Sequence, residues 1–466
     1  MSSAVVNSAH TRKGNSPFTM KKAFCKTPEF LISAAGLLTL GGLYLYWCVS
    51  TSAPVYGRIS AFVCAALFAG VCLRFVPGWM DFWRKGSPSP AETGDEPPHM
   101  GLKIFLSLLT YVLFILLLTY LIRVSAGYGG SFKNYLSFWT CADSAHYLDI
   151  ARDGYLSEGS IDRLVQLVFL PGYPLAVRLM QVFVGNYLYA GLLVSALSFA
   201  GAGWAIYRLS RLDMDHDSAL RTVKYLCLMP GAFFFAAPMS ESLFLLLCAL
   251  CVYCTRKGRW FIGCLFGALA AFTRSLGLML FVPLFFELVS SLGKEGKRRS
   301  LGRFAALLLI PLGFGAYCAV NYVVSGDPFK FMEYQREHWG QQMGFFFNTA
   351  SYQLQQAVGC ARTDLPMLLG LWLPNLLCIF GSLAAMLVGA KRLRPSYTAW
   401  FIAYFVVAIG ATWLLSAPRY LAALIPLPMA LSSLSERAWA DNVLTVLLSL
   451  FSLFYLVAFA LRWQVW

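Results

Sequence analysis

The sequence predicts an all-α integral membrane protein that crosses the bilayer many times. Of its 466 residues, 58% are hydrophobic and only 13% are charged, whereas about 25% of the residues of a soluble domain are charged. Apolar runs of about 20 residues, long enough to cross a bilayer as a helix, recur along the whole chain. Most hydrophobic side chains are therefore expected to face lipid or neighbouring helices.

The apolar runs, taken in order, predict a polytopic helical bundle of about 11–13 transmembrane helices. One further segment, 165–185, is apolar but contains Pro171-Gly172-Tyr173-Pro174, so a bent or re-entrant helix is expected there. The predicted spans are 31–50, 59–78, 102–123, 187–207, 222–238, 240–256, 260–273, 275–292, 303–324, 367–390, 397–415, 420–434 and 442–464.

The basic residues predict the orientation of the bundle. Residues 1–30 form a basic tail that is too long and polar for a cleaved signal peptide, so we expect a cytoplasmic segment. With this tail inside, alternation brings the basic loops 293–302 and 391–396 to the inner side, as the positive-inside rule requires. The net charge of +15 is thus explained by basic loops on the cytoplasmic side of the membrane. The basic residues are scattered over short loops, which does not favour nucleic-acid binding.

The loops predict the domain organisation. Residues 31–78 are expected to form a two-helix N-terminal extension, which the Pro- and Ser-rich cytoplasmic linker 79–101 joins to the main bundle, 102–466. The two longest loops, 124–186 and 325–366, both fall on the outer side. Long loops gathered on one face are where function is usually carried.

Several ionisable and polar residues fall on this same outer face. Charges at or within a membrane are costly and are retained for function, so the group predicts a functional site. Its members are Asp143, His146, Glu241, Arg274, Gln335, His338, Arg419 and Tyr420.

Each of these residues also has a simpler interpretation. Asp143 suits a catalytic base or only a helix N-cap. Glu241 begins an apolar run, where it would complement the helix dipole. Arg274 and Arg419 would either bind a phosphate or reach to lipid headgroups. His338, followed by a tryptophan, suits an interfacial anchor as well as a binding residue.

Other acidic residues are expected to have ordinary roles. Asp149 and Asp153 lie beside Arg152 and are interpreted as solvated surface charge. Asp213-Met214-Asp215 has the D-x-D form that holds a metal on sugar nucleotides, but it falls on the predicted inner face. No metal site is predicted, and no phosphate-binding loop or zinc-protease motif is present.

The cysteines are interpreted mainly as packing residues. Cys248, Cys251 and Cys254 have helical spacing within an apolar run, where small, easily buried side chains are common. Cys141 and Cys360 fall in the two outer loops, so a disulfide between them is an open alternative.

Group transfer from a lipid-linked donor would use such an outer face. The donor phosphate lies at headgroup level, where an arginine can hold it, and its isoprenoid tail needs an apolar groove. An acceptor hydroxyl needs a base, which a loop carboxylate supplies.

The motifs resemble a known family, GPI mannosyltransferase 2 of the PIG-V type, and its bacterial relatives. The resemblance spans roughly 135–430, and in this family a tryptophan usually precedes the first aspartate, where this chain has Ala142. The matching blocks are Asp143-x-x-His146-Tyr147-x-x-Ile150-Ala151-x-x-Gly154-Tyr155, Phe169-Leu170-Pro171-Gly172-Tyr173-Pro174-Leu175, Ser240-Glu241-Ser242-Leu243-Phe244, Thr273-Arg274-Ser275-x-Gly277-Leu278 and Ser416-x-Pro418-Arg419-Tyr420.

The resemblance implies a GT-C glycosyltransferase, a multi-span helical bundle with outward-facing catalytic loops in 102–466. Such enzymes transfer a sugar, typically mannose, from a polyprenyl- or dolichyl-phosphate donor with inversion. They need no cofactor beyond the lipid-phosphate sugar, which is a substrate. The acceptor would be a hydroxyl of a glycolipid, glycan or protein.

We therefore expect a hexosyltransferase in which Asp143 is the general base and Arg419 and Arg274 hold the lipid phosphate. His146, Glu241, Gln335, His338 and Tyr420 would bind substrate. A transporter or flippase of a lipid-linked glycan is the alternative, but it favours charges at the bilayer midplane. A structural scaffold would leave the outer charges without a purpose.

The expected location is a multi-pass membrane protein with its site on the outer or lumenal face. The membrane would be the plasma (inner) membrane in a bacterium and the ER membrane in a eukaryote.

Overall fold

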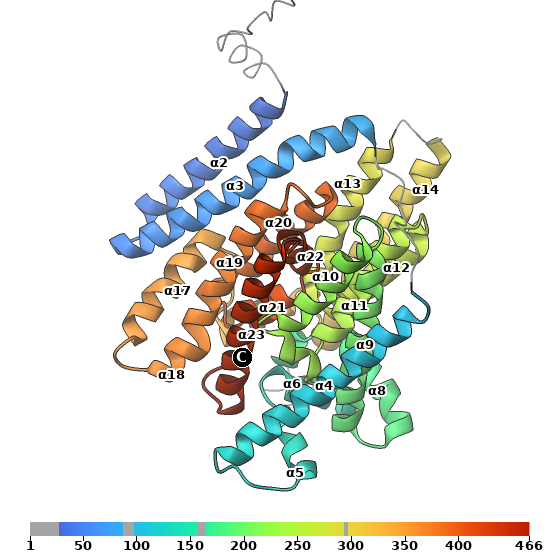
Figure 1. Cartoon of the computed structure of the whole chain (residues 1–466), viewed down its shortest axis with the longest axis vertical. Helices are drawn as coiled ribbons and strands as arrows, with labels where there is room; N and C mark the ends of the chain where they lie inside the picture. The colour runs from blue at the N-terminus through green and yellow to red at the C-terminus, as the bar shows by residue number, and fades with distance from the viewer. Residues whose placement is uncertain (1–27, 87–96, 156–164, 293–296, 466) are drawn as a thin grey trace, which may run out of the picture.

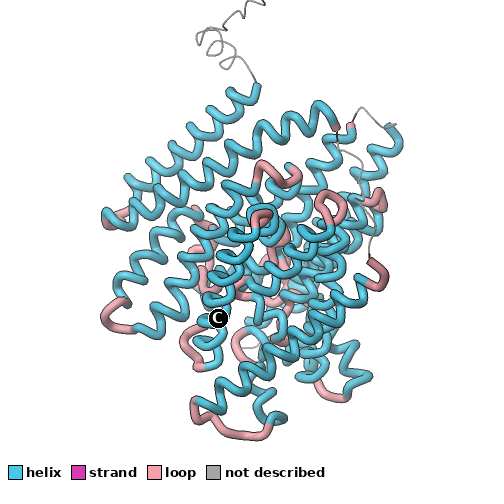
Figure 2. The backbone as a smooth tube through the Cα atoms, viewed as in Figure 1, coloured by secondary structure: helices cyan, strands magenta, loops and turns pink. Residues whose placement is uncertain are grey.

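The structure, a computed structural model, describes residues 28–86, 97–155, 165–292 and 297–465. These residues form helices, and within these ranges the only β pairing is an isolated antiparallel bridge between Met343 and Ala411 (Figures 1 and 2). Residues 1–27 of the predicted tail and 87–96 of the predicted linker lie outside the described residues. The linker residues 79–85 continue the helix that begins at Val55. The all-helical architecture predicted from the sequence is confirmed.

Seven helices in the described part of the chain are long and apolar enough to cross a membrane, and we treat the chain as an integral membrane protein. They are α2 (Pro28–Ser50), α3 (Val55–Lys85), α4 (Met100–Ser125), α9 (Tyr187–Ser210), the continuous pair α14 (Lys297–Leu307) and α15 (Leu309–Ser325), the run α18 (Leu365–Met367), η5 (Leu368–Trp372) and α19 (Leu373–Gly389), and α23 (Ala438–Ala460).

Shorter helices fill the remaining bundle and its loops. Apolar among them are α12 (Trp260–Thr273), η4 (Ser275–Leu280) with α13 (Phe281–Ser291), and α20 (Pro395–Ile409). The others are α5 (Phe132–Leu136), η1 (Ser137–Trp139), α6 (Asp143–Asp153), η2 (Val165–Val168), α8 (Gly172–Val184), α10 (His216–Leu228), η3 (Ala232–Ala236), α11 (Glu241–Arg256), α16 (Lys330–Trp339), α17 (Phe346–Cys360), α21 (Ala417–Ala422) and α22 (Pro426–Leu434).

Two of the thirteen predicted spans differ from continuous helices because proline interrupts them. The predicted span 222–238 is α10 followed by the short turn η3. Met229, which precedes Pro230, has an extended ψ of 137°, as the proline ring requires of its predecessor, and the helix ends there. The predicted span 420–434 is likewise divided into α21 and α22 ahead of Pro426.

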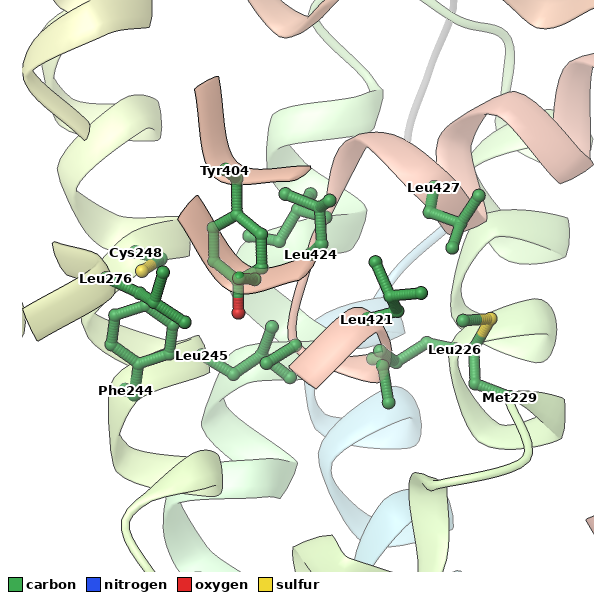
Figure 3. Packing of buried hydrophobic residues seen from close by; sticks show 14 of the residues in the cluster. Leu226, Met229, Phe244, Leu245, Cys248, Leu276, Tyr404, Leu421, Leu424 and Leu427 are labelled. Carbon is green, nitrogen blue, oxygen red and sulfur yellow. The ribbon is translucent and has the colours of Figure 1, made fainter. Parts of the chain in front are cut away.

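The interior of the bundle is apolar, and the short helix α21 lies within it. Buried side chains from α10, α11, α20 and α22 surround Leu421 of this short helix, including Leu226, Leu245, Tyr404 and Leu427 (Figure 3). The hydroxyl of Tyr404 donates to the carbonyl of Tyr420 at 2.9 Å. A six-residue helix is therefore fixed by the packing around it rather than by its own hydrogen bonds.

The N-terminal hairpin of α2 and α3 lies along one edge of the bundle (Figure 1). α3 packs against α17 and α19, whereas α2 packs mainly on α3. Only 6% of the most apolar window of α2 is buried, against 61% for α9. Of the seven long helices, α2 therefore leaves the largest share of its surface exposed, on the side that faces away from α3.

The interrupted segment 165–185 bends as predicted, and α8 begins at Gly172 within its proline motif. With 13 residues, α8 is too short to span a bilayer. The exposed residues of α8 are apolar except for Arg178, whose guanidinium donates to the carbonyls of Ala151 and Arg152 at the end of α6. The exposed apolar residues are Leu175, Leu179, Val182 and Phe183.

Candidate functional site

The site begins at a strained turn ahead of α6. Ala142 has φ 46° and ψ −130°, a conformation that favours glycine and costs a residue with a side chain about 1–3 kcal/mol. The turn starts α6 at Asp143, which is the first helical residue rather than the N-cap. The N-cap alternative for Asp143 is therefore wrong, and its carboxylate faces another partner.

That partner comes from the far end of the sequence. Arg419 lies on α21, and its Nη1 donates to Oδ2 of Asp143 at 2.7 Å. The two residues are 276 positions apart. The structure thus joins the first outer loop to the segment near the C-terminus through one ion pair.

A second carboxylate and a second arginine complete the cluster. Glu241 is the first residue of α11, and its Oε1 accepts from Nη1 of Arg274 at 2.6 Å and lies 3.3 Å from Nε of Arg419. Arg274 also donates to Ser240 Oγ at 2.9 Å, and this hydroxyl is 2.9 Å from the hydroxyl of Tyr147. We call Asp143, Glu241, Arg274 and Arg419 the four-charge cluster; its formal charge is balanced.

The two carboxylates of the cluster differ in their exposure to solvent. The Glu241 side chain is 2% exposed, whereas that of Asp143 is 27% exposed. Both arginines are largely buried behind these acids, with 12% exposure for Arg274 and 7% for Arg419. The arginines do not reach out to lipid headgroups, and Asp143 is the charged group of the cluster that solvent reaches most easily.

Some polar atoms at the cluster are buried without a hydrogen bond. Among the described residues, Oε2 of Glu241, Nε of Arg419 and Oγ of Ser144 have no hydrogen-bond partner. Buried polar atoms are nearly always paired, because leaving one unpaired costs about 1–3 kcal/mol. Oε2 of Glu241 and Oγ of Ser144 are therefore available to a water or a ligand, whereas Nε of Arg419 keeps its ion pair with Glu241.

Aromatic and amide groups hold Arg419 in place. The ring of Tyr420 lies 5.4 Å from the guanidinium carbon of Arg274 and 5.5 Å from that of Arg419. Buried Asn375 accepts from the backbone N–H of Ala417 at 2.8 Å, and its amide donates to Gln353 and to the Leu414 carbonyl, both at 3.1 Å. The start of α21 is therefore fixed by a buried side-chain amide.

His146 lies beside the cluster in an aromatic setting. Its ring stacks on Phe169 with centroids 4.7 Å apart, and Trp339 at the end of α16 is 6.4 Å away. Phe169 belongs to the Phe-Leu-Pro-Gly motif in the same outer loop, and the contacts of His146 and Phe169 with Trp339 join this loop to the second one. His146 lies on α6, the helix that begins with Asp143.

Gln335 and His338 are not brought into the four-charge cluster. Gln335 donates to Gln341 at 2.6 Å, and Gln341 donates to the carbonyl of Trp413 at 2.8 Å. His338 is exposed, with its ring 5.8 Å from Tyr334 of the same helix. These two residues support the second outer loop rather than the cluster itself.

The simpler interpretations of the remaining acids are confirmed. Arg152 pairs with Asp149 at 2.8 Å and with Asp153 at 3.1 Å, all on the surface of α6. Asp213 is bound by Arg256, and Asp215 caps α10 by accepting from the N–H of Ser218. The D-x-D motif is therefore engaged in structural contacts.

Neither a metal cluster nor a disulfide is found in the described ranges. No group of three or more His, Cys, Asp and Glu side chains there could hold a metal ion. Cys141 and Cys360 are both free, so the possible disulfide between them is not formed, and Cys248 and Cys251 are buried packing residues.

Sequence reasoning missed several residues of the site. Tyr147 reaches Ser240, Met239 Sδ lies 3.5 Å from Arg419 Nη1, and Asn375 fixes α21. Asn375 carried a usable signal, because a lone amide within an apolar run needs hydrogen-bond partners. Tyr147 lies within the first matching motif, although no role was assigned to it. Met239 carried no signal, because methionine is an ordinary packing residue.

A family model matches part of the chain. Residues 115–295 match the family described as mannosyltransferase (PIG-V), which confirms the resemblance seen in the sequence over that range. The matched range contains Asp143, Glu241 and Arg274, whereas Arg419 and the hairpin of α2 and α3 lie outside it. No curated protein matches the chain.

Solved structures of low sequence identity share part of the arrangement. ArnT from Cupriavidus metallidurans, bound to undecaprenyl phosphate, has 14% identity and a TM-score of 0.46, over 75% of this chain and 63% of that one. The archaeal oligosaccharyltransferase AglB from Archaeoglobus fulgidus, in complex with an inhibitory peptide and a dolichol-phosphate, has 12% identity and a TM-score of 0.38, over 77% and 56%. The chain spans less than two thirds of each.

Proposed function

We propose that this protein is a membrane glycosyltransferase that moves a mannose, or a similar hexose, from a polyprenyl- or dolichyl-phosphate to an acceptor hydroxyl. The observation that carries the proposal is the four-charge cluster, in which a solvent-reachable carboxylate, Asp143, is 2.7 Å from a buried arginine, Arg419. The match to a mannosyltransferase family over residues 115–295 supports the choice of sugar.

Asp143 would act as the general base. It would accept the proton of the acceptor hydroxyl while that oxygen attacks C1 of the sugar. The bond between C1 and the phosphate oxygen breaks in the same step, so the configuration at C1 inverts and the lipid phosphate leaves. The ion pair with Arg419 orients the carboxylate, which supports this role because a base must be positioned within hydrogen-bond reach of its proton.

The two arginines would hold the departing phosphate. A guanidinium has five N–H donors, so Arg419 can bind a phosphate oxygen while it keeps its bond to Asp143. Negative charge grows on the phosphate as the C1 bond breaks, and donors already in place stabilise that charge most in the transition state. Tyr420, beside both guanidiniums, would line this position.

The remaining polar residues would bind sugar or acceptor groups. Oε2 of Glu241, buried without a partner in the described residues, would accept from a sugar hydroxyl. His146 would contribute from its stack on Phe169, and Gln335 and His338 from the second outer loop. We place the site on the outer or lumenal face of the plasma (inner) or ER membrane, and we expect no metal or organic cofactor.

Substitution of Asp143 by Asn tests the proposal. The variant keeps the shape of the side chain but cannot take up the proton, so transfer of radiolabelled mannose from polyprenyl-phosphate mannose should fall by about 10²–10⁴-fold. The matched control is Asp149→Asn on the exposed surface of the same helix, which should keep normal transfer. Near-normal transfer by a folded Asp143→Asn variant would refute the assignment, and lipid flipping without transfer would favour a flippase.

A further inference from the structure

A second concave site lies away from the four-charge cluster, between the N-terminal hairpin and α17. It is a cleft with a cavity volume of about 420 Å³. One wall is the turn between α2 and α3, and the other is α17 with residues that follow α16 and α20. The hairpin lies outside the range matched by the mannosyltransferase family, so the cleft is a feature of this chain beyond that match.

The walls of the cleft carry aromatic rings. Trp413 is 38% exposed, whereas Leu414, the next residue in the chain, is 1% exposed. Tyr352 of α17 lies beside it, with ring centroids 6.0 Å apart and planes at 50°. Two tilted rings at the edge of a hollow offer flat apolar surfaces, and tyrosine adds a hydroxyl at its rim.

The polar groups of the cleft are all uncharged. None of the ten described residues that line it is charged, and the polar ones are hydroxyls and amides. Among them are Asn348, Gln355 and Thr412. No side chain that lines the cleft would neutralise a phosphate or a carboxylate, so the lining favours an uncharged ligand.

The cleft is built from fixed side chains. Trp47 at the end of α2 donates from Nε1 to Oδ1 of Asn348 at 2.9 Å, which joins the hairpin to α17. Arg58 holds the turn from outside the cleft by donating to the carbonyls of Thr51 and Ala53. The walls are therefore arranged before any ligand enters, which limits the entropy that binding costs.

A short segment connects the cleft with the four-charge cluster. Thr412 and Trp413 line the cleft, and the chain continues from them to Arg419. Six residues span at most about 20 Å, which is the upper limit for the separation of the two sites and is comparable to the length of a ligand of several linked units. Gln341 bonds the carbonyl of Trp413, and Asn375 bonds that of Leu414, so the segment is fixed along its length.

We propose that this cleft binds an uncharged carbohydrate, the glycan portion of the acceptor. A pyranose ring has a face of C–H groups, which packs on an aromatic ring, and a rim of hydroxyls, which pair with amides and hydroxyls. The walls of the cleft offer both kinds of group and no charge. The identification of this glycan with the acceptor rests on the proposed function; the binding of a neutral sugar does not.

Binding of mannotriose to the full-length protein in detergent tests the inference. Saturation-transfer NMR and calorimetry should detect binding, and Trp413→Ala should weaken it at least tenfold. Tyr352→Phe, which removes only a hydroxyl, should weaken mannotriose binding several-fold. This milder change keeps the test valid if Trp413→Ala does not fold. Trp439→Ala is the matched control, because this ring is 64% exposed on α23 and lies away from the cleft. Its affinity for mannotriose should equal that of the unaltered protein.

The outcomes separate the two proposals. Unchanged affinity in both cleft variants would overturn the inference, as would equally tight binding of an oligosaccharide of glucuronic acid. Asp143→Asn should bind mannotriose normally while it loses transfer. If Asp143→Asn loses transfer, but Trp413→Ala and Tyr352→Phe bind mannotriose normally, the cleft assignment fails and the proposed function stands. If the cleft variants weaken mannotriose binding but Asp143→Asn stays active, the proposed role of Asp143 fails and the cleft assignment stands.

Discussion

At the scale of single residues, Glu241 carries the electrostatic balance of the four-charge cluster. It accepts from Arg274 at 2.6 Å and lies 3.3 Å from Arg419, while its own side chain is 2% exposed. Two guanidiniums this deeply buried repel each other and lose their hydration, so each needs a carboxylate. Asp143 serves only Arg419, which leaves Glu241 as the group that both arginines share.

Substitution of Glu241 by Ala should therefore destabilise the folded protein. Breaking a buried ion pair costs about 3–5 kcal/mol, and we expect a clear fall in the thermal unfolding midpoint in detergent. Glu241→Gln, which keeps the shape but not the charge, should unfold at a higher temperature than Glu241→Ala yet transfer mannose poorly. Glu337→Ala, a change at an exposed side chain, is the control and should match the unaltered protein. An unchanged midpoint in Glu241→Ala would show that the acid does not balance the arginines.

The sequence identified the charged members of the cluster but not their pairing. Ionisable residues in an apolar chain stand out, and topology alone puts Asp143 and Arg419 on one face. Which carboxylate meets which arginine depends on packing between helices that are far apart in sequence. For the same reason Gln335 and His338, equally conspicuous in the sequence, lie outside the cluster.

At the scale of elements, α21 is positioned by a close approach of two backbones. A Cβ atom placed on Gly231 would lie 2.4 Å from the carbonyl oxygen of Pro418 and 2.8 Å from the amide nitrogen of Arg419. Only a glycine permits this contact, because backbone atoms cannot move aside as a flexible side chain can. The turn before η3 thus sets the position of the helix that carries Arg419.

Substitution of Gly231 by Ala should displace α21. Overpacking of this kind costs about 1–3 kcal/mol, and a shift of about 1 Å at a reacting group can lower the rate about 10²-fold. We expect a marked fall in mannose transfer with a smaller loss of thermal stability. The control is Gly41→Ala on α2, where a Cβ meets nothing within 4 Å. Equal transfer rates for the two variants would refute the positioning role.

The long helices were predictable because 20-residue apolar runs have few alternatives in a membrane. The short elements were less so, since their ends depend on local chemistry. The end of α10 before Pro230 was readable from the proline, but the apolar character of 222–238 obscured it. The bend before α8 was predicted because two prolines and a glycine fall together.

At the scale of the whole molecule, a second charged network lies at the opposite end of α11 from Glu241. Arg256 makes two hydrogen bonds to Asp213, at 2.7 and 2.9 Å, and Arg394 makes two to Glu287, at 2.6 and 2.9 Å. Burial alone would raise the pKa of Asp213, but the hydrogen bonds and charges of Arg256 and Arg394 outweigh it and hold that pKa below its ordinary value. Its contribution to stability is thus present at neutral pH and is lost as the pH falls through that lowered pKa.

Substitution of Glu287 by Ala should separate stability from activity. The substitution removes the carboxylate to which the Arg394 guanidinium makes two hydrogen bonds. The thermal unfolding midpoint should therefore fall by an amount that corresponds to about 3–5 kcal/mol. Transfer measured well below that midpoint should stay close to normal, because the network is a helix length away from Asp143. Asp81→Ala, at an exposed pair with Lys85, should change neither quantity. Strong loss of transfer at low temperature would contradict this separation.

The alternating spans predicted that several acids and arginines share one face of the bundle. Asp143, Glu241, Arg274 and Arg419, which were among them, meet in the structure. The second network was not foreseen, because Glu287 and Arg394 fall in or beside apolar runs with no motif around them. The D-x-D motif, at which no metal site was predicted, contributes Asp213 to this network through its ion pair with Arg256.

The short helix α8 gives the bilayer itself a part in the geometry of the site. Its exposed apolar residues suit the boundary between headgroups and acyl chains, so we expect α8 to follow that boundary. Arg178 donates to the last carbonyls of α6, the helix that begins with Asp143. We therefore expect the position of the Asp143 carboxylate to depend on the thickness of the membrane, because a shift of α8 is transmitted to α6 through these hydrogen bonds.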